Sequence, residues 1–172
     1  MKVVVVNNQD EILRYVDKKD RTSEDIIRVS GLWIFNSNGE LLIAQRALDK
    51  KHDPGKWGPS VAGTVEEGET YVSNILKETK EELGVSLTED ELVQSTHRYV
   101  QTSHKYFVRI FFVEMDVPIS AFKVQAEEVE QVKWISAQEL QEWFVQAPQD
   151  FILSFGDALQ DYIRFSTNWL KS

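Results

Sequence analysis

The sequence predicts an α/β fold, and the order of its periodic segments is the reason. Short apolar runs bounded by turn residues fill the first third of the chain and return after its middle, as strands do. Between these groups, residues 70–84 have the period of an amphipathic helix, and residues 137–144 and 150–170 are two further helical segments. Strands, one helix, strands and then helices are typical of helices packed on a sheet.

The N-terminal region is expected to contain two strand pairs. Residues 3–6 and 11–16 form a small leading pair. Residues 26–35 form a long strand, the Asn-Ser-Asn-Gly sequence at 36–39 is a turn signal, and residues 41–46 return as a second strand. We therefore expect a hairpin over these two runs.

The remaining strands flank the central helix. A polar, basic stretch at 47–56 leads to a short strand at 61–62, just before the helix. After the helix, residues 92–101 and 106–115 are two further strands, and residues 129–135 are the last. No internal repeat is visible among these runs.

The central helix carries three carboxylates on one face. Glu78, Glu81 and Glu82 stand at i, i+3 and i+4, which places them on the same side of a helix. Like charges at this spacing repel by roughly a few tenths of a kcal/mol per pair. A hard divalent cation prefers carboxylate oxygens and would offset that repulsion. Thr70 is placed to cap the helix, and Gly84 to end it.

The apolar side of this helix points elsewhere. At about 100° per residue, its apolar stripe is directed roughly 120° away from the carboxylates. The stripe consists of Val72, Ile75, Leu76, Thr79 and Leu83. The helix can therefore bury one side and present acid from another, and the glycine-containing residues 63–68 enter it as a loop.

The spacing around this helix resembles the Nudix box. That pattern is Gly, five residues, Glu, seven residues, Arg-Glu, an apolar residue, any residue, Glu-Glu, any residue, Gly and an apolar residue. The matching positions here are Gly63, Glu69, Lys77-Glu78, Thr79, Glu81-Glu82, Gly84 and Val85. Two of them depart from the pattern. Lys77 replaces the arginine, which keeps the charge without the planar fork, and Thr79 replaces an aliphatic residue.

The resemblance implies a fold, a reaction and a cofactor. Nudix domains are α/β/α sandwiches with a mixed β-sheet, and we expect a single domain over residues 1–172 with its core at about 26–144. The N-terminal strand pair and the C-terminal helix are then additions to that core. The resemblance also implies that Mg²⁺ or Mn²⁺ assists the hydrolysis of a diphosphate linkage in a small-molecule nucleoside diphosphate derivative.

The family pattern assigns roles to individual residues. The metal ligands that it implies are Glu78, Glu81, Glu82 and the carbonyl of Gly63. Lys77 is expected to brace the box carboxylates, and Glu69 to stabilise the loop at the entry to the helix. The general base is either a box glutamate, Glu81 or Glu82, or a glutamate from a later loop, where Glu128 stands in the corresponding place.

Cationic side chains near the box are the candidates for binding substrate phosphates. Arg46 and Lys56 flank the polar stretch, and Lys51 lies between them in the sequence. A protein of net charge −9 that acts on phosphates needs such local cations in addition to metal ions. The same net charge disfavours bulk binding of nucleic acid.

A narrower resemblance concerns the segment before the box. Residues 57–64, Trp-Gly-Pro-Ser-Val-Ala-Gly-Thr, resemble the Nudix branch that contains isopentenyl-diphosphate isomerases and their hydrolase-like relatives. The isomerases carry a catalytic Cys and then Gly-His, where this chain has Ala62, Gly63 and Thr64. Thiol-mediated proton transfer therefore has no agent here. The alternatives to a hydrolase are an isopentenyl-diphosphate delta-isomerase-like protein and a non-enzymatic nucleotide-binding Nudix module.

The composition limits the cellular setting. The chain has no cysteine, which excludes disulfides and zinc–thiolate sites and suits a reducing compartment. The valine run at 3–6 is too short for a signal peptide or a membrane span, so we expect a cytoplasmic protein with no membrane partner. The aromatic stripe of the C-terminal helix is expected to pack on the domain or at a dimer interface, which leaves a homodimer open.

Overall fold

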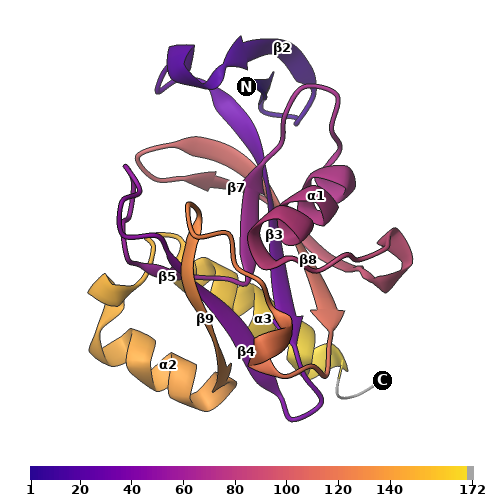
Figure 1. Ribbon diagram of the computed structural model, residues 1–172. Helices are drawn as coiled ribbons and strands as arrows, with labels where there is room; N and C mark the ends of the chain where they lie inside the picture. The colour runs from indigo at the N-terminus through magenta and orange to yellow at the C-terminus, as the bar shows by residue number, and fades with distance from the viewer. Residues whose placement is uncertain (170–172) are drawn as a thin grey trace.

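A mixed β-sheet with helices on both sides forms the molecule (Figure 1). The computed structural model describes residues 1–169, and the backbone alone of residues 94 and 95. The strands within that range are β1 (Lys2–Val6), β2 (Ile12–Asp17), β3 (Ile26–Phe35), β4 (Glu40–Arg46), β5 (Trp57–Gly58), β6 (Val61–Thr64), β7 (Val93–Gln101), β8 (Lys105–Glu114) and β9 (Val129–Ser136). The helices are α1 (Tyr71–Leu83), α2 (Ala137–Gln146) and α3 (Phe155–Trp169). Among the described residues, no helix is long and apolar enough to cross a membrane.

Strand β3 organises the sheet. It runs parallel to β8, from Ile26↔Lys105 to Phe35↔Glu114, and antiparallel to β1 and β6. One parallel pairing among antiparallel ones makes the sheet mixed. The predicted α/β fold with a mixed sheet is therefore confirmed.

The hairpin predicted over residues 26–46 is wrong beyond its turn. Strands β3 and β4 share the single pair Phe35↔Leu41 and then separate. Strand β4 pairs instead with β9 and β5, because β6 and β8 occupy the two edges of β3. The segment before the box bridges the two strands: Gly58 pairs with β4, and Val61 pairs with β3.

Helix α1 packs on one face of the sheet. Leu32 and Ile34 of β3 and Phe111 of β8 are fully buried there, together with Ile75 and Leu83 of the helix. The buried positions of α1 are Tyr71, Asn74, Ile75, Thr79 and Leu83, whereas Val72 and Leu76 are half-buried. The apolar stripe predicted for this helix is therefore correct in part. Its buried face includes the polar Asn74, which hydrophobic periodicity does not select.

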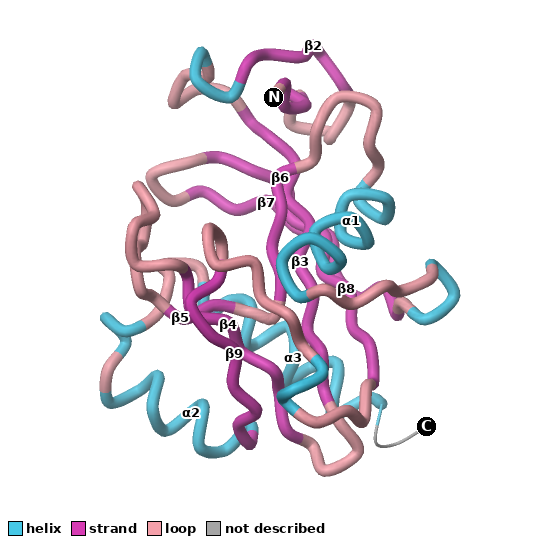
Figure 2. Tube along the Cα trace, in the orientation of Figure 1, coloured by secondary structure: helices cyan, strands magenta, loops and turns pink. Residues whose placement is uncertain are grey.

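Helices α2 and α3 pack on the opposite face of the sheet, as Figure 2 also shows. Trp33 of β3 is fully buried and meets Phe155 of α3 edge-on, with ring centroids 6.0 Å apart. Phe112 of β8 stacks on Phe165 at 3.9 Å. Trp169 stacks on Phe165 in turn. The described part of the C-terminal aromatic stripe therefore packs on the sheet, and residue 170 lies outside the described residues.

The C-terminal helix begins later than residue 150, where the sequence predicts it. A 3-10 turn occupies Pro148–Asp150, and α3 begins at Phe155. Between them, Phe151 forms a parallel bridge with Trp57, and the N–H of Ile152 donates to the Trp57 carbonyl at 3.0 Å. These contacts hold the chain extended over residues 151–152, so the helix cannot start there.

The N-terminal strand pair is fastened to the rest of the molecule by a polar cluster. Asp10 Oδ1 accepts a hydrogen bond from Arg28 Nε at 2.7 Å, and Asp10 Oδ2 accepts one from the Tyr71 hydroxyl at 3.0 Å. His97 Nε2 lies 2.9 Å from the same Oδ2 atom. Arg109 places its guanidinium over the Tyr71 ring, 5.0 Å from the centroid. The β1–β2 turn is thereby tied to β3, β7 and the first turn of α1.

Candidate active site

Helix α1 begins and ends where the sequence predicts. The Oγ1 atom of Thr70 accepts a hydrogen bond from the Ser73 N–H at 3.1 Å, and the Ser73 hydroxyl accepts one from the Thr70 N–H at 2.9 Å. Gly84 has a φ of 69°, the left-handed conformation that ends a helix at little cost for glycine. These two ends fix the position of the helix carboxylates relative to the loop that precedes it.

Gly63 allows the side chain of Glu78 to lie directly against strand β6. A Cβ added at Gly63 would collide with Glu78 Cγ and would lie 2.8 Å from Glu78 Cδ. It would also lie 2.9 Å from Asn74 Oδ1. The first glycine of the box is therefore required by the close approach of a strand backbone to a carboxylate.

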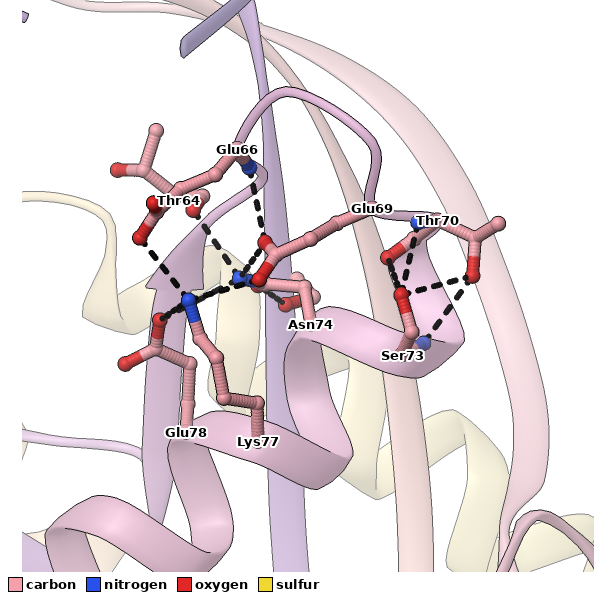
Figure 3. Close-up of polar contacts among 9 residues, drawn as sticks. Thr64, Glu66, Glu69, Thr70, Ser73, Asn74, Lys77 and Glu78 are labelled. Carbon is pink, nitrogen blue, oxygen red and sulfur yellow. Dashed lines mark hydrogen bonds and ion pairs between the residues drawn. The ribbon is translucent and has the colours of Figure 1, made fainter. Parts of the chain in front are cut away.

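Lys77 contacts three carboxylates where the loop at residues 63–68 leads into α1 (Figure 3). Its Nζ atom lies 2.9 Å from Glu66 Oε1, 2.8 Å from Glu69 Oε1 and 3.4 Å from Glu78 Oε1. Burial alone would lower the pKa of Lys77, but the hydrogen bonds with Glu69 and Glu66 raise it well above its usual value. Lys77 therefore stays charged and contacts Glu78 as expected for the brace. Glu66 is a third partner that the sequence did not indicate.

Asn74 is the residue of this cluster that the sequence analysis missed. Its Nδ2 atom donates to the Thr64 carbonyl at 3.1 Å, to Glu69 Oε2 at 2.9 Å and to Glu78 Oε1 at 3.3 Å. Its Oδ1 atom accepts a hydrogen bond from the Ser30 hydroxyl. The sequence feature that could have identified Asn74 is its position four residues before Glu78, which places both side chains on the same face of the helix.

The two carboxylates bonded to Asn74 have opposite pKa shifts. Burial raises the pKa of Glu78, and the charges of Glu81 and Glu69 add to the rise while Lys77 opposes it. Burial also acts to raise the pKa of Glu69, but hydrogen bonds from Lys77, the Glu66 N–H and Asn74 hold it below its usual value. Glu69 is thus a fixed anion that anchors the loop, and Glu78 is the group whose charge is poorly compensated.

Glu82 lies on a pocket that Glu128 and Arg46 also line. The pocket runs along residues 44–46, 58–62 and 128–129, so it lies where β4 separates from β3. Burial, followed by the charges of Glu78 and Glu128, raises the pKa of Glu82 to about 8. The charges of Arg46 and Lys50 oppose this rise. The charges of Glu78 and Glu128 thus both disfavour the charged form of Glu82, and a bound cation would relieve that repulsion.

Glu128 is held in the pocket by a lysine that the sequence analysis did not single out. Lys50 Nζ lies 2.6 Å from Glu128 Oε2. The Ala47 N–H donates to the Glu128 carbonyl at 3.0 Å, so the backbone is fixed as well. The basic character of residues 47–56 was the available signal, but it did not distinguish Lys50 from its neighbours.

The three predicted phosphate-binding cations are not brought together. Arg46 lines the pocket, and its Nε atom donates to the His52 carbonyl at 3.1 Å. Lys56 lies 3.6 Å from Asp53 in an ion pair, and Lys51 is exposed. Only Arg46 of the three contributes to the pocket wall among the described residues.

The box carboxylates share a helix face but do not converge on one point. Among the described side chains, no group of three or more Asp, Glu or His residues is arranged to hold a metal ion. Glu78 is bonded to Lys77 and Asn74, and Glu81 is exposed. The oxygen donors nonetheless suit a hard divalent cation, because burial and then neighbouring carboxylates raise the pKa values of Glu78 and Glu82, and a bound cation would offset both effects.

Comparison with known proteins identifies the family. The chain matches the NUDIX domain model over residues 26–155. It is 31% identical over 133 residues to an isopentenyl-diphosphate Delta-isomerase of Citrobacter koseri, over 76% of this chain and 74% of that protein. It is 29% identical over 138 residues to the uncharacterized Nudix hydrolase PA4841 of Pseudomonas aeruginosa, over 73% of this chain and 78% of that protein.

Solved structures share the fold. DR0079 from Deinococcus radiodurans has a TM-score of 0.78 at 23% identity, over 93% of this chain and 98% of that one. The NUDIX domain of Shewanella oneidensis NrtR, complexed with ADP ribose, has a TM-score of 0.63 at 16% identity, over 87% and 92% of the two chains. At these identities the likeness concerns the α/β fold. The family model spans most of the sequence, from the long strand β3 to the start of α3, and this chain therefore belongs to the Nudix family.

Proposed function

We propose that this protein is a Mg²⁺- or Mn²⁺-dependent hydrolase that cleaves a diphosphate linkage in a nucleoside diphosphate derivative. The observation that carries the proposal is the pocket in which Glu82, Glu128 and Arg46 meet. Glu82 offers a carboxylate to a metal ion, Glu128 offers a base, and the Arg46 guanidinium suits a phosphate. Membership of the Nudix family, in which relatives are described as hydrolases, supports the same reaction class.

The metal ligands in this proposal are Glu78, Glu81, Glu82 and the carbonyl of Gly63. When bound, the divalent ion would neutralise charge on the phosphate oxygens and lower the pKa of bound water. Lys77 positions Glu78 by a contact of 3.4 Å. Because its charge also compensates Glu66 and Glu69, Lys77 would hold the loop that leads into α1 in place beside the ligand Glu78.

The general base in this proposal is Glu128. It lines the same pocket as Glu82 but comes from a different segment of the chain, so it remains free to accept a proton while the helix carboxylates hold the metal. Lys50 fixes its Oε2 atom, which leaves Oε1 for the attacking water. Arg46 binds a substrate phosphate oxygen, and Lys56 and Lys51 supply positive potential outside the pocket.

A nucleoside diphosphate derivative is the proposed substrate class. The NrtR domain, which shares the fold, is complexed with ADP ribose, a compound of this class. We further propose that residues 1–172 form one domain with its core at about 26–144 and that the protein acts in the cytoplasm. The absence of cysteine in the sequence and of a membrane-spanning helix among the described residues agrees with that location.

Isomerisation of a prenyl diphosphate is the second candidate, because several relatives bear the name isopentenyl-diphosphate Delta-isomerase. The residue at the place of the isomerase cysteine is Ala62, which is exposed on the pocket wall. A methyl side chain cannot donate or accept a proton, so this reaction would need another acid at the same place. A nucleotide-binding module without turnover is the third candidate, and it predicts binding of the same compounds unchanged.

The test is an incubation of the purified protein with Mg²⁺ or Mn²⁺ and a panel of nucleoside diphosphate derivatives plus isopentenyl diphosphate. Phosphorus NMR follows the products, with Glu82→Gln and Glu128→Gln alongside the wild type. We expect metal-dependent cleavage that falls by about a hundredfold or more in Glu128→Gln, the contribution of a general base. Isomerisation of isopentenyl diphosphate without phosphate release would instead establish the isomerase function. Binding of these compounds without any reaction would establish a nucleotide-binding module.

A further inference from the structure

The C-terminal segment that follows α2 contributes one residue to the pocket. Ile152 is half-buried and lines the same cavity as Glu82 and Glu128. No other described residue beyond Val129 belongs to that lining. The segment is far from the box in sequence, and nothing in the box pattern requires it. Its presence at the pocket therefore calls for a role of its own.

Ile152 is held firmly in this place. Its N–H donates to the Trp57 carbonyl at 3.0 Å, and its carbonyl accepts from the Phe155 N–H at 3.0 Å. The preceding Phe151 is buried and packs on Trp143 and Phe155, with ring centroids 4.9 Å and 4.3 Å away. With both backbone groups bonded and its neighbour anchored in the core, Ile152 presents a preorganised apolar surface.

Ile152 lies beside the backbone that leads into the box. A Cβ placed on Gly58 would lie 3.5 Å from Ile152 Cδ1, which is ordinary van der Waals contact. Pro59 and Ala44 line the pocket next to this position. The pocket therefore has an apolar wall, and it also has the charged side chains of Arg46 and the two glutamates.

We propose that Ile152 contacts the nucleoside of the substrate and determines which organic group the enzyme accepts. The assignment rests on the proposed function. A nucleoside has apolar ring faces and polar edges, which match a wall of this kind beside charged groups. A wholly apolar prenyl chain would leave the polar lining facing hydrocarbon, which is unfavourable. In the proposed function, Arg46 and a cation held by the carboxylates would bind the diphosphate end, which leaves the nucleoside end for Ile152.

The experiment compares two probes in the presence of Mg²⁺: ADP-ribose, which carries a nucleoside, and methyl diphosphate, which does not. Dissociation constants are measured by calorimetry in a Glu128→Gln parent, which slows turnover of ADP-ribose during the titration, and in the same parent with Ile152→Ala or Leu153→Ala added. Leu153 is the matched control, because it is the next residue, is 74% exposed and does not line the pocket. We expect Ile152→Ala to weaken ADP-ribose about tenfold, the effect of removing apolar contact in a pocket, and to leave methyl diphosphate unchanged. Leu153→Ala should change neither.

The outcomes separate this inference from the proposed function. Equal effects of Ile152→Ala on both probes, no effect on either, or no binding of ADP-ribose by the Glu128→Gln parent would each overturn the assignment. If the binding results are as expected but the wild type hydrolyses none of the nucleoside diphosphate derivatives, the proposed function is overturned and the assignment stands. Thermal unfolding of each variant, and recovery of ADP-ribose affinity in Ile152→Leu, exclude a general loss of structure as the cause.

Discussion

Replacing Lys77 by methionine is the sharpest test of how the box is held together. Methionine keeps the length and apolar stem of the side chain but removes its charge. Lys77 Nζ lies within 2.9 Å of Glu66 and Glu69 and 3.4 Å from Glu78. Without the ammonium, these three carboxylates face one another. Their remaining hydrogen bonds come from the Asn74 amide, to Glu69 and Glu78, and from the Glu66 N–H, to Glu69. We therefore expect the folded state to be destabilised.

The expected loss of stability in Lys77→Met depends on how deeply the ion pairs of Lys77 are buried. Exposed ion pairs contribute about 0–1 kcal/mol, whereas removing one partner of a fully buried pair costs about 3–5 kcal/mol. The Lys77 side chain is 30% exposed, and those of Glu69 and Glu78 are 18% and 17% exposed. We therefore expect a loss of about 2 kcal/mol, an intermediate value after solvent screening. In a chain of this size that corresponds to a Tm lower by about 4–8 °C.

The assay is thermal unfolding followed by circular dichroism at pH 7, low salt and without divalent metal. Lys80→Met is the matched control, because Lys80 lies on the same helix, is exposed and has no ion pair among the described residues. It should leave the Tm within about 1 °C, as surface substitutions do. Lys77→Arg keeps the charge and should recover most of the lost stability.

The pH dependence gives a second check on the same variant. The hydrogen bonds to Glu69 hold its folded-state pKa below the usual value of 4.5. Such a group stabilises the fold above its unfolded pKa, and the contribution is lost as the pH falls through the lower folded value. The difference in Tm between wild type and Lys77→Met should thus be full at pH 7 and shrink below pH 4.5. An unchanged Tm in the variant, or a difference that persists in acid, refutes the reasoning.

Three further predictions concern the same region. Gly63→Ala should lower stability by about 1–3 kcal/mol, the cost of overpacking, because the new Cβ would meet Glu78 Cδ at 2.8 Å. Gly58→Ala is the control for the added methyl group, because Gly58 has no positive φ and its new Cβ would lie at an ordinary 3.5 Å from Ile152 Cδ1. Chemical denaturation measures both variants. Glu82, with its pKa raised to about 8, should release a proton when Mg²⁺ binds, so Mg²⁺ affinity measured by calorimetry should strengthen from pH 6 to 8 in the wild type and stay flat in Glu82→Gln. By the same shift, Glu82 stabilises the metal-free fold below pH 4.5 and loses that contribution as the pH rises through about 8. Asp10→Asn removes the charged partner of the Arg28 side chain, which is 16% exposed. By chemical denaturation, it should lower the free energy of unfolding by about 3 kcal/mol. Asp17→Asn, whose carboxylate lies 3.9 Å from the N-terminus, should lower it by less than about 1 kcal/mol.

Local signals in the sequence were sufficient for the central helix. Thr70 and Gly84 are chemically specific cap residues, and the structure confirms both ends of α1. The i, i+3 and i+4 spacing of the box glutamates places them on one helix face regardless of the rest of the molecule. The roles of these glutamates as metal ligands remain predictions, as does the role of Glu128 as the base.

Structural features that depend on contacts between residues far apart in the sequence could not be predicted from local patterns. The hairpin over β3 and β4 failed because β6 and β8, which come later in the chain, take the edges of β3. The helix start at residue 150 failed because Phe151 pairs with Trp57, almost a hundred residues earlier. In both cases a tertiary partner outcompeted the local preference of the segment.

By itself, the sequence determined the α/β class, the central helix with its caps and the carboxylate face, because these depend on residues only a few positions apart. The tertiary structure decided which groups share the pocket. Arg46 and Glu128 reach Glu82 from separate segments, Lys50 pairs with Glu128, and Ile152 joins the pocket from beyond α2. The proximity of these side chains depends on how the strands pair and how the chain returns to the sheet. No periodicity along a single segment encodes it.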